Sequence, residues 1–327
     1  MGKKSHTPWD FCHFGNVDEV RAALEKGKDV NCQNEKNQTA LMQAARRDYV
    51  SIMRLLLEQP LIEVNMTDNS GFTALYWAVY CDKIEAVRLL LADQRVDVNI
   101  KNADNQTALI YAASRCSENR DSILKLLLEH PSINVNLADD RGLTALRVAI
   151  ESKDIETVKT LLADERVDVN YACRMPMPAG CTPLWAAGQT NNIDIFKLLL
   201  SDQRVDVNWK TESGCAVLHS LLWDKDNIKL FELLLAHERV DVNCKHEQLS
   251  ETVLHQATVG KNVEVVRLIL AEPRFTSANE LDSEGNTALR NAAVEGLWDV
   301  FRELTHHPSI DLGVRDQDGW SVDDLAR

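Results

Sequence analysis

The sequence has no long apolar run. Its longest runs are as short as Leu55-Leu56-Leu57, whereas a membrane-spanning helix needs about 20 mostly apolar residues. The first residues, Met1 to His6, lead to Pro8 and Trp9 without the apolar segment of a secretory signal. We therefore predict neither a secretory signal nor membrane insertion.

Basic residues are outnumbered, and the cysteines show no pairing pattern. The 327 residues include 36 Lys and Arg against 50 Asp and Glu, which makes the formal net charge -14. Nucleic acids and anionic membranes are bound by basic surfaces, so we expect neither as a partner. The eight cysteines form no Cys-x-x-Cys pair, and the chain is too long for a small disulfide scaffold. We interpret them as reduced thiols, which predicts a cytoplasmic protein and leaves a nuclear location open.

The sequence also lacks the short motifs of common catalytic and cofactor sites. It contains no glycine-rich dinucleotide or phosphate loop, no Gly-x-Ser-x-Gly and no His-Glu-x-x-His. His306 and His307 are adjacent, so on a helix they would point about 100° apart, and no Cys/His pair with zinc-like spacing lies nearby. We predict no catalytic residue, no cofactor and no metal.

What the sequence has instead is one segment that recurs along nearly its whole length. Successive copies lie 32, 34, 34, 37, 38, 34, 36, 35 and 34 residues apart. A period near 34 indicates one supersecondary unit stacked many times, and such a stack grows without a second core. We therefore predict a single domain over residues 1–327. The anchors are Thr7-Pro8-Trp9, Thr39-Ala40-Leu41, Thr73-Ala74-Leu75, Thr107-Ala108-Leu109, Thr144-Ala145-Leu146, Thr182-Pro183-Leu184, Ala216-Val217-Leu218, Thr252-Val253-Leu254, Thr287-Ala288-Leu289 and Ser321-Val322-Asp323.

Residues 39–72 show what one copy predicts. Thr39 can cap a short helix whose apolar face carries Leu41 and two alanines. Four apolar residues between 52 and 56 then have the spacing of a second helix, which ends at Pro60. The remaining residues alternate in polarity and include turn residues, as in a hairpin-like finger. Helices this short need neighbouring units for stability.

The repeated unit resembles the ankyrin repeat. The resemblance rests on Gly-x-Thr-x-Leu followed by Ala, on Leu-Leu-Leu in the second helix and on Asp-Val-Asn before the next finger, and it covers roughly residues 7–327. It implies an all-α ankyrin-repeat solenoid of stacked helix-turn-helix units with β-hairpin-like fingers. We assign nine repeats and a partial tenth, at about 5–36, 37–70, 71–104, 105–141, 142–179, 180–213, 214–249, 250–284, 285–318 and 319–327.

One position departs from the family pattern in most copies. The turn between the two helices usually holds Gly, which only Gly296 retains. Asp and Asn tolerate a left-handed backbone at modest cost, and Lys is less suited to it. We expect local changes of turn geometry but no change of fold. The residues at this turn are Asp48, Asp82, Lys153, Asn191, Lys225 and Lys261.

The predicted binding surface is the concave side formed by finger tips and exposed positions of each first helix. By the resemblance, it holds the residue before each anchor Thr and the two residues after the Ala pair. Aromatics and arginines recur there and are typical of binding hot spots, and the arginines would suit an acidic or C-terminal peptide. The alternative is that each aromatic packs on a neighbouring repeat. The predicted partner-binding residues are Arg46, Arg47, Phe72, Tyr80, Arg115, Arg141, Trp185, Trp223 and Trp320.

An asparagine closes most copies. We favour a structural role, because Asn can bind the backbone groups of a turn. The resemblance also implies that these residues are candidates for an asparaginyl hydroxylase that modifies ankyrin repeats. The candidates are Asn65, Asn99, Asn136, Asn170, Asn208 and Asn243.

Three functional hypotheses follow. The first is a monomeric, non-catalytic adaptor or scaffold that binds a protein or peptide on the concave face. The second is a substrate-receptor or regulatory subunit of an enzyme complex such as a ubiquitin ligase, although no second docking motif is recognisable in the sequence. The third, an enzyme, lacks a catalytic constellation. The finger at 171–181 is lengthened by about four residues, and loops of this kind often carry function.

Overall fold

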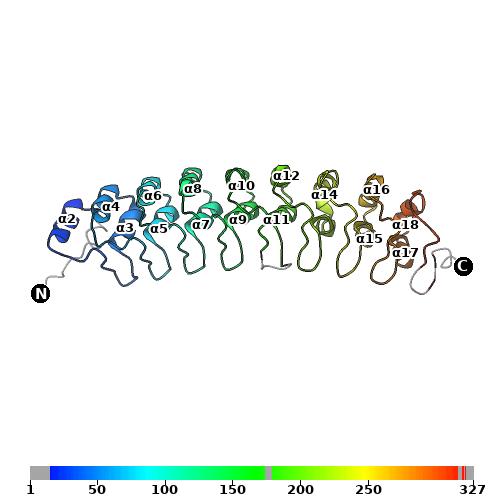
Figure 1. The fold of residues 1–327 in the computed structure, drawn as a ribbon, viewed down its shortest axis with the longest axis horizontal. Coiled ribbons are helices and arrows are strands. Elements are labelled where there is room, and N and C mark those ends of the chain that lie inside the picture. The colour runs from blue at the N-terminus through cyan, green and yellow to red at the C-terminus, as the bar shows by residue number, and fades with distance from the viewer. Residues whose placement is uncertain (1–14, 174–178, 316–318, 320, 322–327) are drawn as a thin grey trace. The chain divides into compact units, whose positions relative to one another are not determined.

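The described part of the chain contains seventeen α-helices and no named strand, which confirms the all-α prediction. The computed structural model describes residues 15–173, 179–315, 319 and 321 (Figure 1). The chain divides into Met1–Asp168, which we name unit 1, and Val169–Arg327, which we name unit 2. None of the helices in the described ranges is long and apolar enough to cross a bilayer.

Unit 1 consists of two parallel rows of helices with fingers along one edge (Figure 1). The first helices of its repeats, α3, α5, α7 and α9, pack side by side, and the second helices pack in a row behind them. Alanines of the first helices are fully buried between them, which permits close packing. The bounds are α2 (Val17–Glu25), α3 (Ala40–Arg47), α4 (Val50–Leu57), α5 (Ala74–Tyr80), α6 (Ile84–Leu91), α7 (Ala108–Ser114), α8 (Arg120–Glu129), α9 (Ala145–Glu151) and α10 (Ile155–Leu162).

Unit 2 repeats the arrangement with one irregular copy. Its third helix is only four residues long and continues as two short 3-10 helices. The bounds are α11 (Pro183–Gln189), α12 (Ile193–Ser201), α13 (Val217–Ser220), η1 (Leu221–Trp223), η2 (Lys225–Asn227), α14 (Ile228–Leu235), α15 (Val253–Val259), α16 (Val263–Ala271), α17 (Ala288–Val294) and α18 (Trp298–Thr305).

The anchor threonines begin the first helices, as predicted. The Thr39 hydroxyl accepts the N–H of Met42, and Thr73 accepts that of Tyr76 in the same way. The same cap is found at Thr107, Thr144, Thr182 and Thr287. Such a cap stabilises a helix by about 1 kcal/mol. Ala216 has no hydroxyl and caps nothing, and the helix that follows it is the four-residue α13.

The turn between the two helices takes the left-handed conformation with and without glycine. Its φ is positive at Asp48, Asp82, Lys153, Asn191, Lys261 and Gly296. The expected change of turn geometry does not occur at these positions and is found at Lys225, which begins the 3-10 helix η2 instead. In that copy α14 begins twelve residues after its anchor, against eleven for α12 and α16. The extra residue is taken up by the 3-10 turns, so no left-handed residue is needed there.

The fingers are hairpin-like and contact one another within each unit. Isolated antiparallel bridges close several of them, among them Gln33 with Thr39 and Ala138 with Thr144. The Ala103 N–H of one finger donates to the Ser70 carbonyl of the preceding finger at 2.9 Å. Gly71, at φ 75°, lies so close to this neighbour that a Cβ would be 2.7 Å from Ala103 N. The fingers therefore form a continuous edge rather than independent loops.

Candidate functional site

The closing asparagines connect each repeat to the next. Asn65 Nδ2 donates to the Arg95 carbonyl at 2.8 Å, and its Oδ1 accepts the Asp97 N–H at 2.8 Å. Asn31, Asn99 and Asn136 do the same in unit 1, and Asn170, Asn208 and Asn243 in unit 2. The predicted structural role is confirmed, with the partner in the neighbouring repeat. Modification of these side chains stays a prediction.

Two connections of this kind were missed by sequence reasoning. The first is Asn279, which makes the same pair of hydrogen bonds to Ser309 and Asp311. No valine precedes it, so the sequence pattern did not reveal it. Its position 36 residues after Asn243 was the signal that could have identified it. A row of arginines binds the last carbonyls of the preceding second helix, where the helix dipole is negative. Arg95 reaches the Leu57 carbonyl at 2.8 Å. Arg166, Arg239 and Arg274 reach equivalent carbonyls.

Most of these arginines are held in place by an acidic residue two positions before them. Arg95 donates twice to Asp93, two residues before it, and the same Asp/Glu-x-Arg pairing recurs at Arg166, Arg204 and Arg274. The hydrogen bond from Arg95 lowers the pKa of Asp93, and that from Arg204 lowers the pKa of Asp202. These residues stabilise the stack and are engaged with backbone groups, so they are not candidates for partner binding.

Five aromatic side chains gather on the predicted binding side of unit 1. This aromatic cluster comes from the finger before α5, from α5 and from α7. Phe72 stacks on Tyr76 with centroids 4.2 Å apart, and Tyr80 stacks on Tyr111 at 5.2 Å. Trp77 packs edge-on against Tyr80 at 5.6 Å. Such pairs contribute about 0.5–1.5 kcal/mol each beyond the area they bury.

The cluster is anchored on its inner side and open on its outer side. The Trp77 indole donates to Asp68 at 3.0 Å, and the buried Tyr76 hydroxyl accepts from Asn102 at 3.0 Å. Burial, and then the neighbouring Tyr111, raises the pKa of Tyr76, so this phenol is neutral. Tyr80 remains 46% exposed. Trp77 and Tyr111 were not predicted, because nothing in a single repeat indicates that α5 and α7 bring their rings together.

Two arginines lie over opposite ends of the aromatic cluster. Arg46 Cζ is 4.9 Å from the Trp77 ring centroid, and Arg115 Cζ is 5.6 Å from that of Tyr111. Both are exposed, and neither has an ion-pair partner among the residues described. A guanidinium that stacks on a ring keeps its N–H groups available at its edge. The Tyr111 hydroxyl between them is buried without a hydrogen-bond partner in the described structure.

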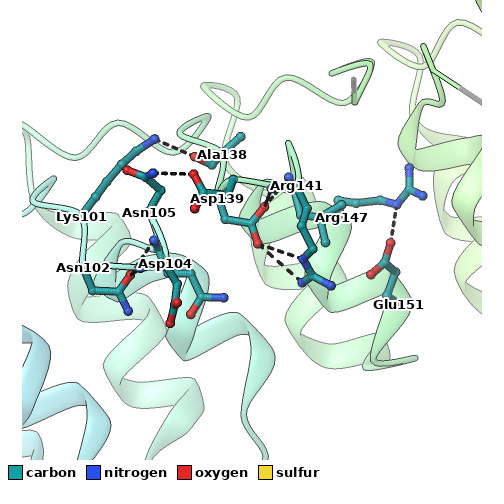
Figure 2. A network of polar contacts seen from close by, with 12 residues as sticks. Lys101, Asn102, Asp104, Asn105, Ala138, Asp139, Arg141, Arg147 and Glu151 are labelled. Atoms are coloured by element: carbon teal, nitrogen blue, oxygen red, sulfur yellow. Dashed lines mark hydrogen bonds and ion pairs between the residues drawn. The ribbon is translucent and has the colours of Figure 1, made fainter. Parts of the chain in front are cut away.

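The other predicted arginines are placed differently. Figure 2 shows that Arg141 folds back onto Asp139, with Nε 3.4 Å from the carboxylate. Arg147 in α9, which was not among the predicted residues, pairs with Glu151 at 3.0 Å in the same view. Arg47 is exposed at the end of α3. The structure thus brings Arg46 and Arg115 to the aromatic cluster and gives Arg141 an acidic partner of its own.

The predicted tryptophans differ in their exposure to solvent. Trp185 is only 2% exposed, so its ring is not accessible to a partner, whereas Trp223 is 55% exposed. Trp185 supports Trp223 edge-on, with centroids 5.6 Å apart. Trp320 lies outside the described residues. The slot before the anchor threonine is less exposed than expected, since Gln38, Leu143, Cys181 and Cys215 are buried there.

Buried titratable side chains occur mainly in unit 2, and their surroundings keep them neutral. Burial lowers the pKa of His219 to about 4, and its Nε2 lies 3.3 Å from the Glu251 carbonyl. Burial, then the nearby Cys244, raises the pKa of Cys215 to about 12, so this thiol is not a nucleophile. No group of three His, Cys, Asp or Glu within the described ranges could hold a metal ion.

The sequence matches known family models over most of its length. Models described as ankyrin repeats match residues 10–102, 83–173 and 218–316, and a model of a single ankyrin repeat matches residues 179–212. No curated protein matches the chain. Ankyrin repeats are generally protein–protein interaction modules. The stacked two-helix units, the fingers and these matches agree, and the chain belongs to the ankyrin repeat family.

Proposed function

We propose that this chain is a non-catalytic adaptor whose unit 1 binds an acidic segment of a partner protein. One observation carries the proposal: Arg46 and Arg115 lie over the two ends of the aromatic cluster without acidic partners among the described residues. Most other arginines of the described chain pair with a carboxylate or a backbone carbonyl. Guanidinium groups bind carboxylates with two parallel hydrogen bonds, so acidic side chains are the matching ligand.

The aromatic cluster would supply the apolar part of the same contact. Tyr80 presents a half-exposed ring between the arginines, and aromatic and arginine side chains commonly dominate binding energy. Such a site recognises an extended segment with an apolar side chain between Asp or Glu residues.

A phage-displayed library of linear peptides, selected on the full chain, tests this proposal. Peptides rich in Asp and Glu should be enriched, and their affinity should fall about tenfold or more in the Arg46→Ala/Arg115→Ala variant. Arg88→Ala is the matched control, because Arg88 is an exposed arginine of a second helix. Selection of peptides without acidic residues, or equal affinity for the double variant, would refute the proposal.

A further inference from the structure

Exposed apolar side chains are unevenly distributed along the described chain. Among the described residues of unit 1, only Leu61 and Tyr80 are strongly exposed large apolar residues. Unit 2 has three times as many, namely Trp223, Leu249, Val259, Val294, Trp298 and Leu312. Single exposed apolar residues need no explanation, but a contiguous group marks an interaction surface.

Four of these residues form a row along unit 2, which we name the apolar row. Trp223, Val259 and Val294 occupy the same slot, seven residues after the anchor, in three consecutive repeats. They are 55%, 46% and 66% exposed. α15 and α17, which carry Val259 and Val294, pack against each other, and α13, which continues into the 3-10 helix of Trp223, packs against α15. Trp298, 68% exposed, continues the row, because its Nε1 lies 3.8 Å from where a Cβ on Gly296 would be.

The exposed ring at the start of the row is held in position from below. Trp223 rests on the buried Trp185. With the Gln256 amide in its hydrogen-bonding orientation, its oxygen accepts from Trp223 Nε1 at 2.6 Å and its nitrogen donates to the His219 carbonyl at 3.2 Å. The indole therefore bridges two repeats while one of its faces meets solvent, which is a preorganised contact rather than a loose side chain.

The row is bordered by acidic side chains. Asp224, Glu295 and Asp299 are exposed and directly follow three of its four members. In the fingers, Lys210 and Lys245 are paired with Glu247 at 3.4 Å and Glu280 at 2.8 Å.

Glu212, Glu251 and Glu284 of these fingers have no ion pair in the described structure. Burial raises the pKa of Glu251, as do the charges of Asp282 and Glu284, so these carboxylates lie close together. Lys225 and Lys261 are exposed two residues after Trp223 and Val259. Across unit 2 as a whole, 24 acidic residues stand against 15 basic ones.

We propose that the apolar row of unit 2 is a second docking surface, which binds a partner segment that carries apolar side chains between Lys or Arg residues. The repeated slot supplies apolar contacts one repeat apart, and the bordering carboxylates supply the complementary charge. The ligand chemistry is opposite to that proposed for unit 1, where arginines border the aromatic rings. The two surfaces therefore select different segments.

Fluorescence anisotropy of labelled synthetic peptides on the full chain tests this inference. The probe is a peptide of Leu and Lys, and its controls are a Ser and Lys peptide of equal charge and a Leu and Glu peptide. Only the Leu and Lys peptide should bind well, and its affinity should fall about tenfold in Val259→Gln/Val294→Gln, which leaves the charge unchanged. Equal binding of the Ser and Lys peptide would reveal charge attraction alone and overturn the proposal.

Two further variants separate this surface from that of unit 1. Glu251→Gln/Glu284→Gln should lower the affinity for the Leu and Lys peptide several-fold and make this affinity less dependent on salt concentration. Arg46→Ala/Arg115→Ala should leave the affinity for this peptide unchanged. The proposed site in unit 1 and the apolar row can therefore fail independently of each other. Because Val259 and Val294 are exposed, circular dichroism should show unchanged folding. Undiminished binding to a folded Val259→Gln/Val294→Gln variant would refute the inference.

Discussion

Units 1 and 2 use the same backbone unit but fill equivalent slots with different chemistry. Seven residues after the anchor, unit 1 has Arg46, Tyr80, Ser114 and Glu151, whereas the last three complete repeats of unit 2 have Trp223, Val259 and Val294. One residue after the anchor leucine, unit 2 alone has histidine, at His219 and His255. The contrast shows that the solenoid fixes where side chains stand, and that substitutions at a few slots decide what each region binds and how it responds to acid.

The largest expected difference is in acid stability. Burial lowers the pKa of His219 to about 4 and lowers that of His255 as well. Above pH about 6.5 both residues are neutral in the folded and unfolded states, so their contribution is fully present. Below it the unfolded state binds protons first, and His219 alone should remove about 3 kcal/mol of stability between pH 6.5 and 4. Urea unfolding across this range should show the loss.

The matched variant is His219→Gln, whose side chain cannot titrate. In this variant the unfolding free energy should depend less steeply on pH over that range. The lowered pKa values of Asp202 and Glu272 reduce stability as the pH falls below about 5, so the effect of the histidine is read between pH 6.5 and 5. An unchanged slope in the variant would show that other groups control acid unfolding.

The next largest effect is expected at the closing asparagines, which both units share. Asn65→Ala in unit 1 and Asn208→Ala in unit 2 each remove two hydrogen bonds to the next repeat. We expect each change to lower the unfolding free energy by about 2 kcal/mol. Asn69→Ala, at an exposed finger, serves as control and should cost less than about 1 kcal/mol. A large loss of unfolding free energy in one unit only would contradict the inference that the same asparagine hydrogen bonds stabilise both units.

The smallest effect concerns the turn between the helices. Lys153 and Lys261 have φ values of 58° and 56°, so glycine there should raise stability by about 0.5–1 kcal/mol. Lys225→Gly should give no gain, because this residue starts a 3-10 helix. Thermal unfolding of the three variants distinguishes them. Equal gains at all three positions would mean that helix context, not backbone strain, controls the effect.

Features within one repeat were predictable from the sequence, and contacts between repeats were not. The anchor threonines cap helices as predicted, since a cap depends on neighbours in sequence. The expected change of turn geometry was wrong for all but one of the non-glycine turn residues, which keep the left-handed conformation. The Arg95 contact with the Leu57 carbonyl spans 38 residues and was missed. Trp185 was predicted at the surface and is buried. The repeat period gives the position of a residue within its repeat, but it does not show which side chains of neighbouring repeats cover that residue.

The sequence by itself determined the class of fold, because a period near 34 residues with threonine caps and alanine faces is typical of one two-helix unit stacked many times. The tertiary structure decided which side chains act together. Rings from α5 and α7 meet under Arg46 and Arg115, and Trp223, Val259 and Val294 align along unit 2. Residues about 35 positions apart become neighbours only when repeats stack, so their combined chemistry does not appear in any single repeat.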